Sequence, residues 1–178
     1  MAKRKFWSSD KIVAFVAMGI SLITLVIFVK QTNIIEEQSH LSVMPYLMME
    51  TSDNGFEKRF RIDVINYGVG PAIIEERTLR YKGEVYDMEF ADFLEQFETE
   101  MDSIKITNRS TLQEGLAIPA GSERNILGIG GGETSYNSFL QLMQGLISDS
   151  LYYEIKYRSI YGDRWRITSQ NESPEKLD

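Results

Sequence analysis

Residues 89–102 contain many carboxylate side chains, whose type and close spacing could form a catalytic or metal-binding site. Paired carboxylates act as general acid and base in glycoside hydrolysis, and carboxylates also bind Ca²⁺. Glycoside hydrolysis needs two carboxylates at a set separation across a cleft, whereas these are neighbours along one segment, and no Asp-x-Asp-x-Asp-Gly calcium loop is present. We therefore expect a solvated acidic face, with docking of a partner protein as the alternative. The candidate residues are Asp92, Glu95, Glu98 and Asp102.

The other residue types exclude several kinds of site. The chain has no cysteine and a single histidine, His40, so disulfides, thiolate metal sites and cysteine nucleophiles are excluded. The stretch from Gly128 to Ser135 precedes a predicted helix, as phosphate loops do, but Glu133 stands where a phosphate would lie. We expect Thr134 or Ser135 to cap that helix instead. We predict a protein that is not an enzyme, with no catalytic, cofactor-binding or metal-binding residue and no cofactor.

Charge excludes nucleic acid as a partner of the whole chain. The 178 residues carry a formal net charge of −7, so the chain as a whole lacks the basic surface that nucleic acid requires. Because 43% of the residues are hydrophobic, the chain can form a buried core. The sequence beyond residue 11 is more acidic still, at −10.

A membrane helix is predicted at Ile12 to Val29, eighteen consecutive residues without a charge. At about 1.5 Å per residue this run covers roughly 27 Å, close to the thickness of a bilayer's hydrocarbon core. A cleaved signal peptide and a buried core helix are the alternatives. No small-x-small cleavage site follows the run, which favours an uncleaved signal anchor. The small residues Ala14, Ala17 and Ser21 could form a stripe that packs closely against another helix, so a homo-oligomer is possible.

Basic residues on the two sides of this segment predict its orientation. Lys3, Arg4, Lys5 and Lys11 precede it, and Lys30 alone follows it closely. Because Lys and Arg resist translocation, we expect the N-terminus in the cytoplasm and the remainder in the periplasm or outside the cell. The protein would then be a single-pass protein of the cytoplasmic (inner) membrane.

Beyond a helical stalk the hydrophobic pattern changes to the alternation of β-strands. Phe60, Ile62 and Val64 alternate with charged residues. About seven or eight short strands separated by turns are predicted in all, among them strands at 72–81 and 112–118. Apolar residues at helical spacing predict two helical insertions, at 88–101 and 134–148, and Ile147 is expected on the packed face of the second. The predicted class is mainly β, an antiparallel immunoglobulin-like β-sandwich behind an N-terminal transmembrane helix. The expected organisation is a cytoplasmic tail (1–11), a transmembrane helix (12–29), a helical stalk (30–43), an extracytoplasmic β-sandwich domain (44–170) and a flexible tail (171–178).

Four short motifs accompany this organisation. They are Ser-Val-x-Pro-Tyr-Leu from Ser42, Asn-x-Gly-x-Gly-Pro-Ala from Asn66, Pro-Ala-Gly from Pro119 and Tyr-Gly-Asp-x-Trp from Tyr161. We interpret the second as a structural turn in which two glycines allow positive φ and Asn66 bonds neighbouring backbone. In this order the motifs resemble a group of uncharacterised bacterial single-pass membrane proteins with an immunoglobulin-like extracytoplasmic domain. The resemblance implies that fold and a bacterial envelope setting, and it implies no catalytic residue.

Function is predicted as non-catalytic interaction or assembly, in which the anchored domain recruits a protein partner in the envelope. Besides the acidic segment, Tyr152 and Trp165 in the last predicted hairpin are candidates for the partner-binding surface, with core packing as their ordinary role. The alternative function is a small accessory subunit of a larger membrane complex for transport, sensing or defence, held mainly through its transmembrane helix.

Overall fold

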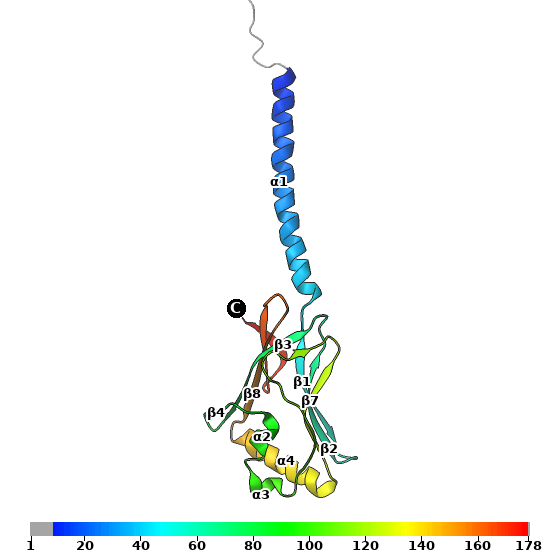
Figure 1. Cartoon of the computed structure of the whole chain (residues 1–178), viewed down its shortest axis with the longest axis vertical. Helices are drawn as coiled ribbons and strands as arrows, with labels where there is room; N and C mark the ends of the chain where they lie inside the picture. Colours follow the sequence, from blue (N-terminus) through cyan, green and yellow to red (C-terminus); the bar gives the residue numbers. More distant parts are fainter. Residues whose placement is uncertain (1–8, 178) are drawn as a thin grey trace, which may run out of the picture. The chain divides into compact units, whose positions relative to one another are not determined.

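The structure is a computed structural model that describes residues 9–177. For Glu98 and Glu172 it describes the backbone only. The basic residues Lys3, Arg4 and Lys5 lie outside this range. The chain divides into two compact units, one ending at Leu41 and one beginning at Ser42. Each unit is described by itself (Figure 1).

The first unit is a single helix, α1 (Ser9–Ser42), which contains the predicted apolar run and continues beyond it. Its most apolar window has a mean hydropathy of 2.9, so the helix is long and apolar enough to span a membrane, a property that signal sequences share. None of its residues is buried within this chain. The hydroxyls of Ser21 and Thr24 donate to the carbonyls of Ala17 and Ile20, each at 2.8 Å, which satisfies them inside the helix.

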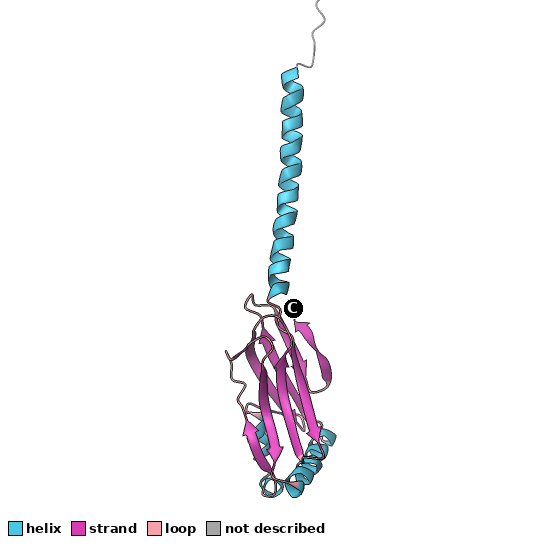
Figure 2. Cartoon of the chain, turned by 90° about the vertical axis from the view of Figure 1, so that its right-hand side faces the viewer, coloured by secondary structure: helices cyan, strands magenta, loops and turns pink. Residues whose placement is uncertain are grey.

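The second unit is mainly β and consists of two antiparallel sheets around one hydrophobic core (Figure 2). The first sheet has the order β1 (Leu47–Asn54), β2 (Arg59–Asn66), β7 (Glu123–Gly130) and β5 (Lys105–Arg109). The second has the order β10 (Asn171–Leu177), β9 (Arg164–Thr168), β8 (Tyr152–Arg158), β3 (Ala72–Tyr81) and β4 (Glu84–Tyr86), and β6 (Ala117–Ile118) pairs with the start of β3. The prediction of a mainly β domain behind a long apolar helix is confirmed.

Alternation builds the core as the sequence predicts. Ile62 and Val64 of β2 are buried, and Ile155, Tyr157 and Ile167 reach the same core from the second sheet. Because successive side chains of a strand point to opposite faces, each sheet offers one apolar face to the other.

The predicted helix at 88–101 is wrong in detail, because the structure has two short helices there, α2 (Phe90–Leu94) and α3 (Glu98–Met101). Between them the amide of Gln96 donates to Phe93, three residues back, which ends the α-helical pattern. Phe93 and Phe97, on either side of the break, both pack edge-on against Tyr81, at centroid distances of 5.6 and 5.9 Å.

The second predicted helix is α4 (Glu133–Ser148), and its details also differ from the expectation. Its N-cap is Gly132, without a side-chain capping bond, so the capping role expected for Thr134 or Ser135 is wrong. Instead the Ser135 hydroxyl accepts a hydrogen bond of 2.7 Å from the amide of Lys105. Ile147, expected on the packed face, is 64% exposed.

Two expectations about strands also need correction, and one observed strand is not predicted by the sequence. The flexible tail expected at 171–178 is wrong for its described part, because β10 pairs with β9 along Asn171–Leu177. The strand expected at 112–118 is confined to β6, because positive φ at Gly115 interrupts the extended backbone. The sequence does not predict strand β5, because only Ile106 of its side chains is half-buried and the alternation of buried and exposed residues is missing.

Candidate functional site

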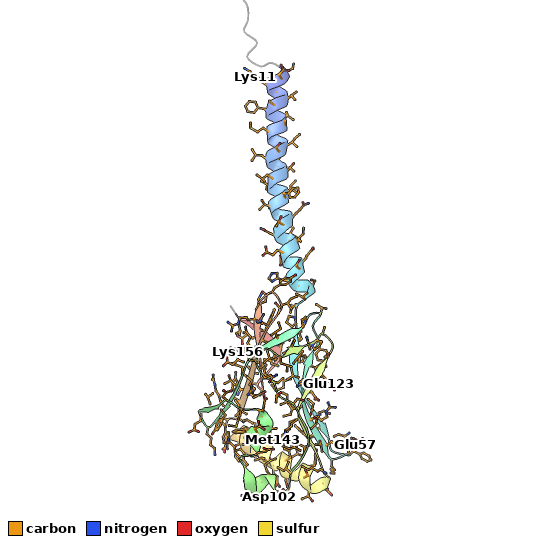
Figure 3. The ribbon with its side chains drawn as sticks, viewed as in Figure 1. Lys11, Glu57, Asp102, Glu123, Met143 and Lys156 are labelled. Carbon is orange, nitrogen blue, oxygen red and sulfur yellow. The ribbon has the colours of Figure 1, made fainter. Side chains whose placement is uncertain are left out.

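The predicted acidic surface is partly neutralised. Asp92 and Glu95 both pair with Arg109 of β5, at 3.4 and 2.9 Å. Asp102 is exposed, at the end of the domain that holds α3 and α4 (Figure 3). The side chain of Glu98 lies outside the described part of the chain. The structure therefore brings two of the four acidic candidates together around one arginine, in exposed ion pairs that are typically weak.

The two aromatic candidates are placed differently from each other. Trp165 is only 6% exposed and stacks on Tyr157 with ring centroids 5.8 Å apart, so its ring belongs to the core and is not available as a partner surface. Tyr152 is half-buried and its hydroxyl donates to Glu154 at 2.8 Å. Lys176 of β10 pairs in register with Trp165, and its ammonium lies over the indole. The strand that replaces the expected tail thus helps to cover Trp165.

Asn66 is a structural device, as predicted, although the glycines after it act differently from the expectation. Its side-chain oxygen accepts from the amides of Tyr46 and Gly68, and its side-chain nitrogen donates to the carbonyls of Gly70 and Ile118. Neither Gly68 nor Gly70 has positive φ. They are needed because a Cβ on Gly70 would lie 1.9 Å from the carbonyl oxygen of Val43. The motif therefore holds the segment that leads into β1.

An open cleft of about 590 Å³ is the best candidate for a binding site. It lies where β1, the end of α4 and the β9–β10 turn meet, and its volume is in the range of ligand pockets. No charged side chain lines it; the residues are Met49, Thr51, Ile62, Phe90, Ile126, Met143, Ile147, Ser150, Leu151, Tyr153, Thr168, Ser169, Gln170 and Asn171. Figure 3 labels Met143, one of the apolar residues that α4 contributes. The lining is suited to uncharged, largely apolar groups.

Tyr153 is the one ionisable side chain in this lining, and it is buried against Phe90 in an edge-on ring contact of 5.7 Å. Burial, and then the nearby Glu89 carboxylate, raises the pKa of Tyr153 far above its usual value, so the phenol keeps its proton at neutral pH. Its hydroxyl has no hydrogen-bond partner in the described part of the chain. Glu89 pairs with Arg77 at 3.3 Å and accepts from the amide of Leu112 at 3.1 Å. This ion pair holds Glu89 in place near the buried phenol.

Strand β1, which forms one wall of the cleft, is an edge strand that lies beside β9 and β10 of the second sheet without pairing with them. It lies at the edge of the first sheet, and no described strand pairs with its outer side. The amide of Leu47 donates to the Tyr157 hydroxyl at 3.2 Å and not to β2. Because backbone groups alternate in direction along a strand, the amides of Met49 and Thr51 face the same free edge. The site therefore combines an apolar cleft with unpaired backbone donors.

Sequence reasoning missed this cleft because its walls come from segments far apart in the chain, and no local motif marks any of them. Neither protein-family models nor curated protein sequences nor solved structures match this chain. The geometry of the cleft and of the β1 edge is therefore the basis of the functional conclusion.

Proposed function

We propose that this protein is a single-pass membrane protein whose extracytoplasmic domain binds an extended, uncharged segment of a protein partner in the cell envelope. The observation that carries this proposal is the uncharged cleft beside the free edge of β1. The role is non-catalytic recruitment: the helix holds the domain at the membrane, and the cleft takes the partner.

Anchoring is supported by the exposed apolar surface of α1, which has no buried residue along its 34 residues. The orientation, with the N-terminus in the cytoplasm and the domain in the periplasm or outside the cell, rests on the basic residues before the span. The acidic remainder of the chain, at −10, favours a domain held away from anionic lipid.

The strand order supports an immunoglobulin-like sandwich. In that fold the first, second, fifth and fourth strands form one sheet, and the third, sixth and seventh form the other. If β4 and β6 are set aside as additions, β1-β2-β7-β5 corresponds to the first sheet and β3-β8-β9 to the second. Strand β10 then extends the second sheet by one strand.

The chemistry of the partner follows from the walls of the cleft. An extended peptide laid along β1 would accept hydrogen bonds from the amides of Met49 and Thr51 and place alternate side chains in the cleft. Charged side chains would lose their hydration there without gaining a counter-ion, since no charged residue lines the site. We therefore expect alternating apolar and uncharged residues in the bound segment.

A photo-crosslinking amino acid placed at position 147, and in parallel at position 85, tests this function in living cells. Ile147 and Val85 are matched in exposure, at 64% and 65%, but only Ile147 lines the cleft. We expect a defined adduct from position 147 alone, with the crosslinked peptide of the partner apolar and uncharged. Thr51→Pro, which removes a donor from the free edge, should abolish the adduct without unfolding the domain. Equal adducts at both positions, or a charged crosslinked peptide, would contradict the proposal.

The accessory-subunit alternative is separated by exchanging residues 12–29 for an unrelated membrane span. The adduct should persist if the domain recognises the partner. If it disappears while the protein remains in the membrane, the transmembrane helix is the principal contact and the cleft is secondary.

A further inference from the structure

Helix α1 carries a continuous uncharged seam that follows a seven-residue repeat. Val13, Ile20, Ile27, Ile34 and Leu41 are each seven residues apart. Four residues after each of the first four come Ala17, Thr24, Gln31 and Gln38. Alternating steps of four and three residues place all of these on one face of a helix, the pattern of a left-handed coiled coil.

Within residues 13–41 the charged residues of the helix are kept away from this seam, and Asp10 lies on the same face one step before its first residue. Lys30, Glu36 and Glu37 all fall at other positions of the repeat. The seam also continues without interruption from the predicted span into the segment that comes after it. There Ile34 and Leu41 are 53% and 58% exposed, which leaves large apolar side chains uncovered outside the predicted span.

We infer that α1 pairs with α1 of a second copy of the chain, in a parallel two-helix coiled coil along this seam. Two copies inserted in the same orientation have their seams parallel and at the same height, so each residue faces its own equivalent. In the membrane, Ala17 lets the two backbones approach closely. Beyond the membrane, Ile34 and Leu41 are covered by the same residues of the partner copy.

The two glutamines argue for a second copy of this chain as the occupant. A glutamine side chain both donates and accepts hydrogen bonds, so Gln31 and Gln38 can each pair with the identical residue of the other copy. A polar residue in such a core lowers stability but selects the aligned, parallel arrangement. An unrelated helix would have to present a matching polar group at the same two heights.

Cysteine crosslinking tests this pairing cleanly, because the natural chain has no cysteine. Full-length single-cysteine variants Ile34→Cys and Leu41→Cys are oxidised in isolated membranes, beside Asn33→Cys and Glu36→Cys on the other faces of the helix. We expect the two seam variants to form disulfide-linked homodimers at least about tenfold faster, since a disulfide needs its Cβ atoms within a few ångströms of each other. Inside the span, Ile20→Cys should exceed Leu22→Cys in the same way.

Two further readouts complete the test. Co-expression of copies with tags of different mass should give a product of intermediate size, which identifies both members as this chain. Adding Ile34→Lys and Leu41→Lys should slow crosslinking at Ile20→Cys, because like charges would then face each other across the pair. Equal rates on all faces, products with a different protein only, or no crosslinks at the seam would overturn the inference. None of these results depends on the cleft, so the proposed function is tested separately.

Discussion

Asn66 uses its side chain entirely inside the protein, and the glycines after it complete the same arrangement. Its four hydrogen bonds join Tyr46, Gly68, Gly70 and Ile118, which belong to three separate stretches of the chain. The amide of Val69 also donates to the carbonyl of Met44 at 3.0 Å. These hydrogen bonds attach the segment before β1 to the rest of the domain.

Gly70→Ala should destabilise the domain by about 2–3 kcal/mol, because the new Cβ would overlap the carbonyl group of Val43 and one of the two backbones must move. Gly145→Ala is the matched control, since a Cβ there, in the last turn of α4, meets nothing within 4 Å. The control should be neutral or stabilising by about 0.5–1 kcal/mol. Urea unfolding of the full-length protein in detergent measures both. A Gly70→Ala protein as stable as the natural one would refute the steric argument.

Tyr157 should make the domain sensitive to alkaline pH. Burial raises the pKa of Tyr157 to about 12 from the ordinary value of 10.0. Folding therefore favours the protonated phenol, and the resulting stability is fully present below pH 10 and is lost as the pH rises toward 12. The amount at stake is roughly 3 kcal/mol for a shift of this size.

Comparison of Tyr157→Phe with Tyr153→Phe, in unfolding experiments from pH 7 upward, checks this origin. Tyr157→Phe should cost about 1 kcal/mol at neutral pH, because the amide of Leu47 loses its acceptor, and should weaken the loss of stability at alkaline pH. Tyr153→Phe should cost nothing at neutral pH, since its hydroxyl has no partner in the described chain. Both variants should weaken the loss of stability at alkaline pH, because burial raises the pKa of both phenols. Equal stabilities of the two variants at neutral pH would show that the hydrogen bond to Leu47 is unimportant.

At the scale of elements, one buried hydroxyl helps to attach the start of α4 to the first sheet. Ser135 Oγ accepts from the amide of Lys105 in β5, the short edge strand of that sheet. Ser135→Ala should lower the free energy of unfolding by about 1 kcal/mol and increase hydrogen exchange at the amide of Lys105. Thr134→Ala, at the exposed neighbouring position, should change neither quantity. If both variants behave alike, the contact is not what holds the start of α4 against β5.

Local patterns predict some elements well and others badly, for identifiable reasons. The sequence predicts strand β3 over its observed bounds, because Pro71 comes before it and a Lys-Gly turn comes after it. Strand β5 and strand β10 lie at sheet edges and are largely exposed, so their sequences lack the alternation that identifies a strand. The helix predicted at 88–101 is divided where the amide of Gln96 bonds three residues back to Phe93, a departure that the hydrophobic spacing does not reveal.

At the scale of the whole molecule, the orientation proposed from the basic residues can be tested directly. Phe56, in the β1–β2 turn, is 96% exposed, so Phe56→Cys should react with a membrane-impermeant maleimide in intact spheroplasts. Ser8→Cys, before the span, should react only after the membrane is lysed. The natural chain has no cysteine to confuse the readout. The reverse labelling pattern would invert the orientation and remove the envelope partner from the proposal.

The sequence by itself determined the apolar helix, the mainly β character of the domain beyond that helix and the structural role of Asn66. These depend on composition, on periodicity and on one short motif, which are properties of neighbouring residues. Tertiary structure alone decided that Trp165 is buried, that residues 171–177 form a strand and that an uncharged cleft opens beside β1. Each of these depends on which segments, distant in the chain, pack against one another, and the free energy of that packing is not contained in any local pattern.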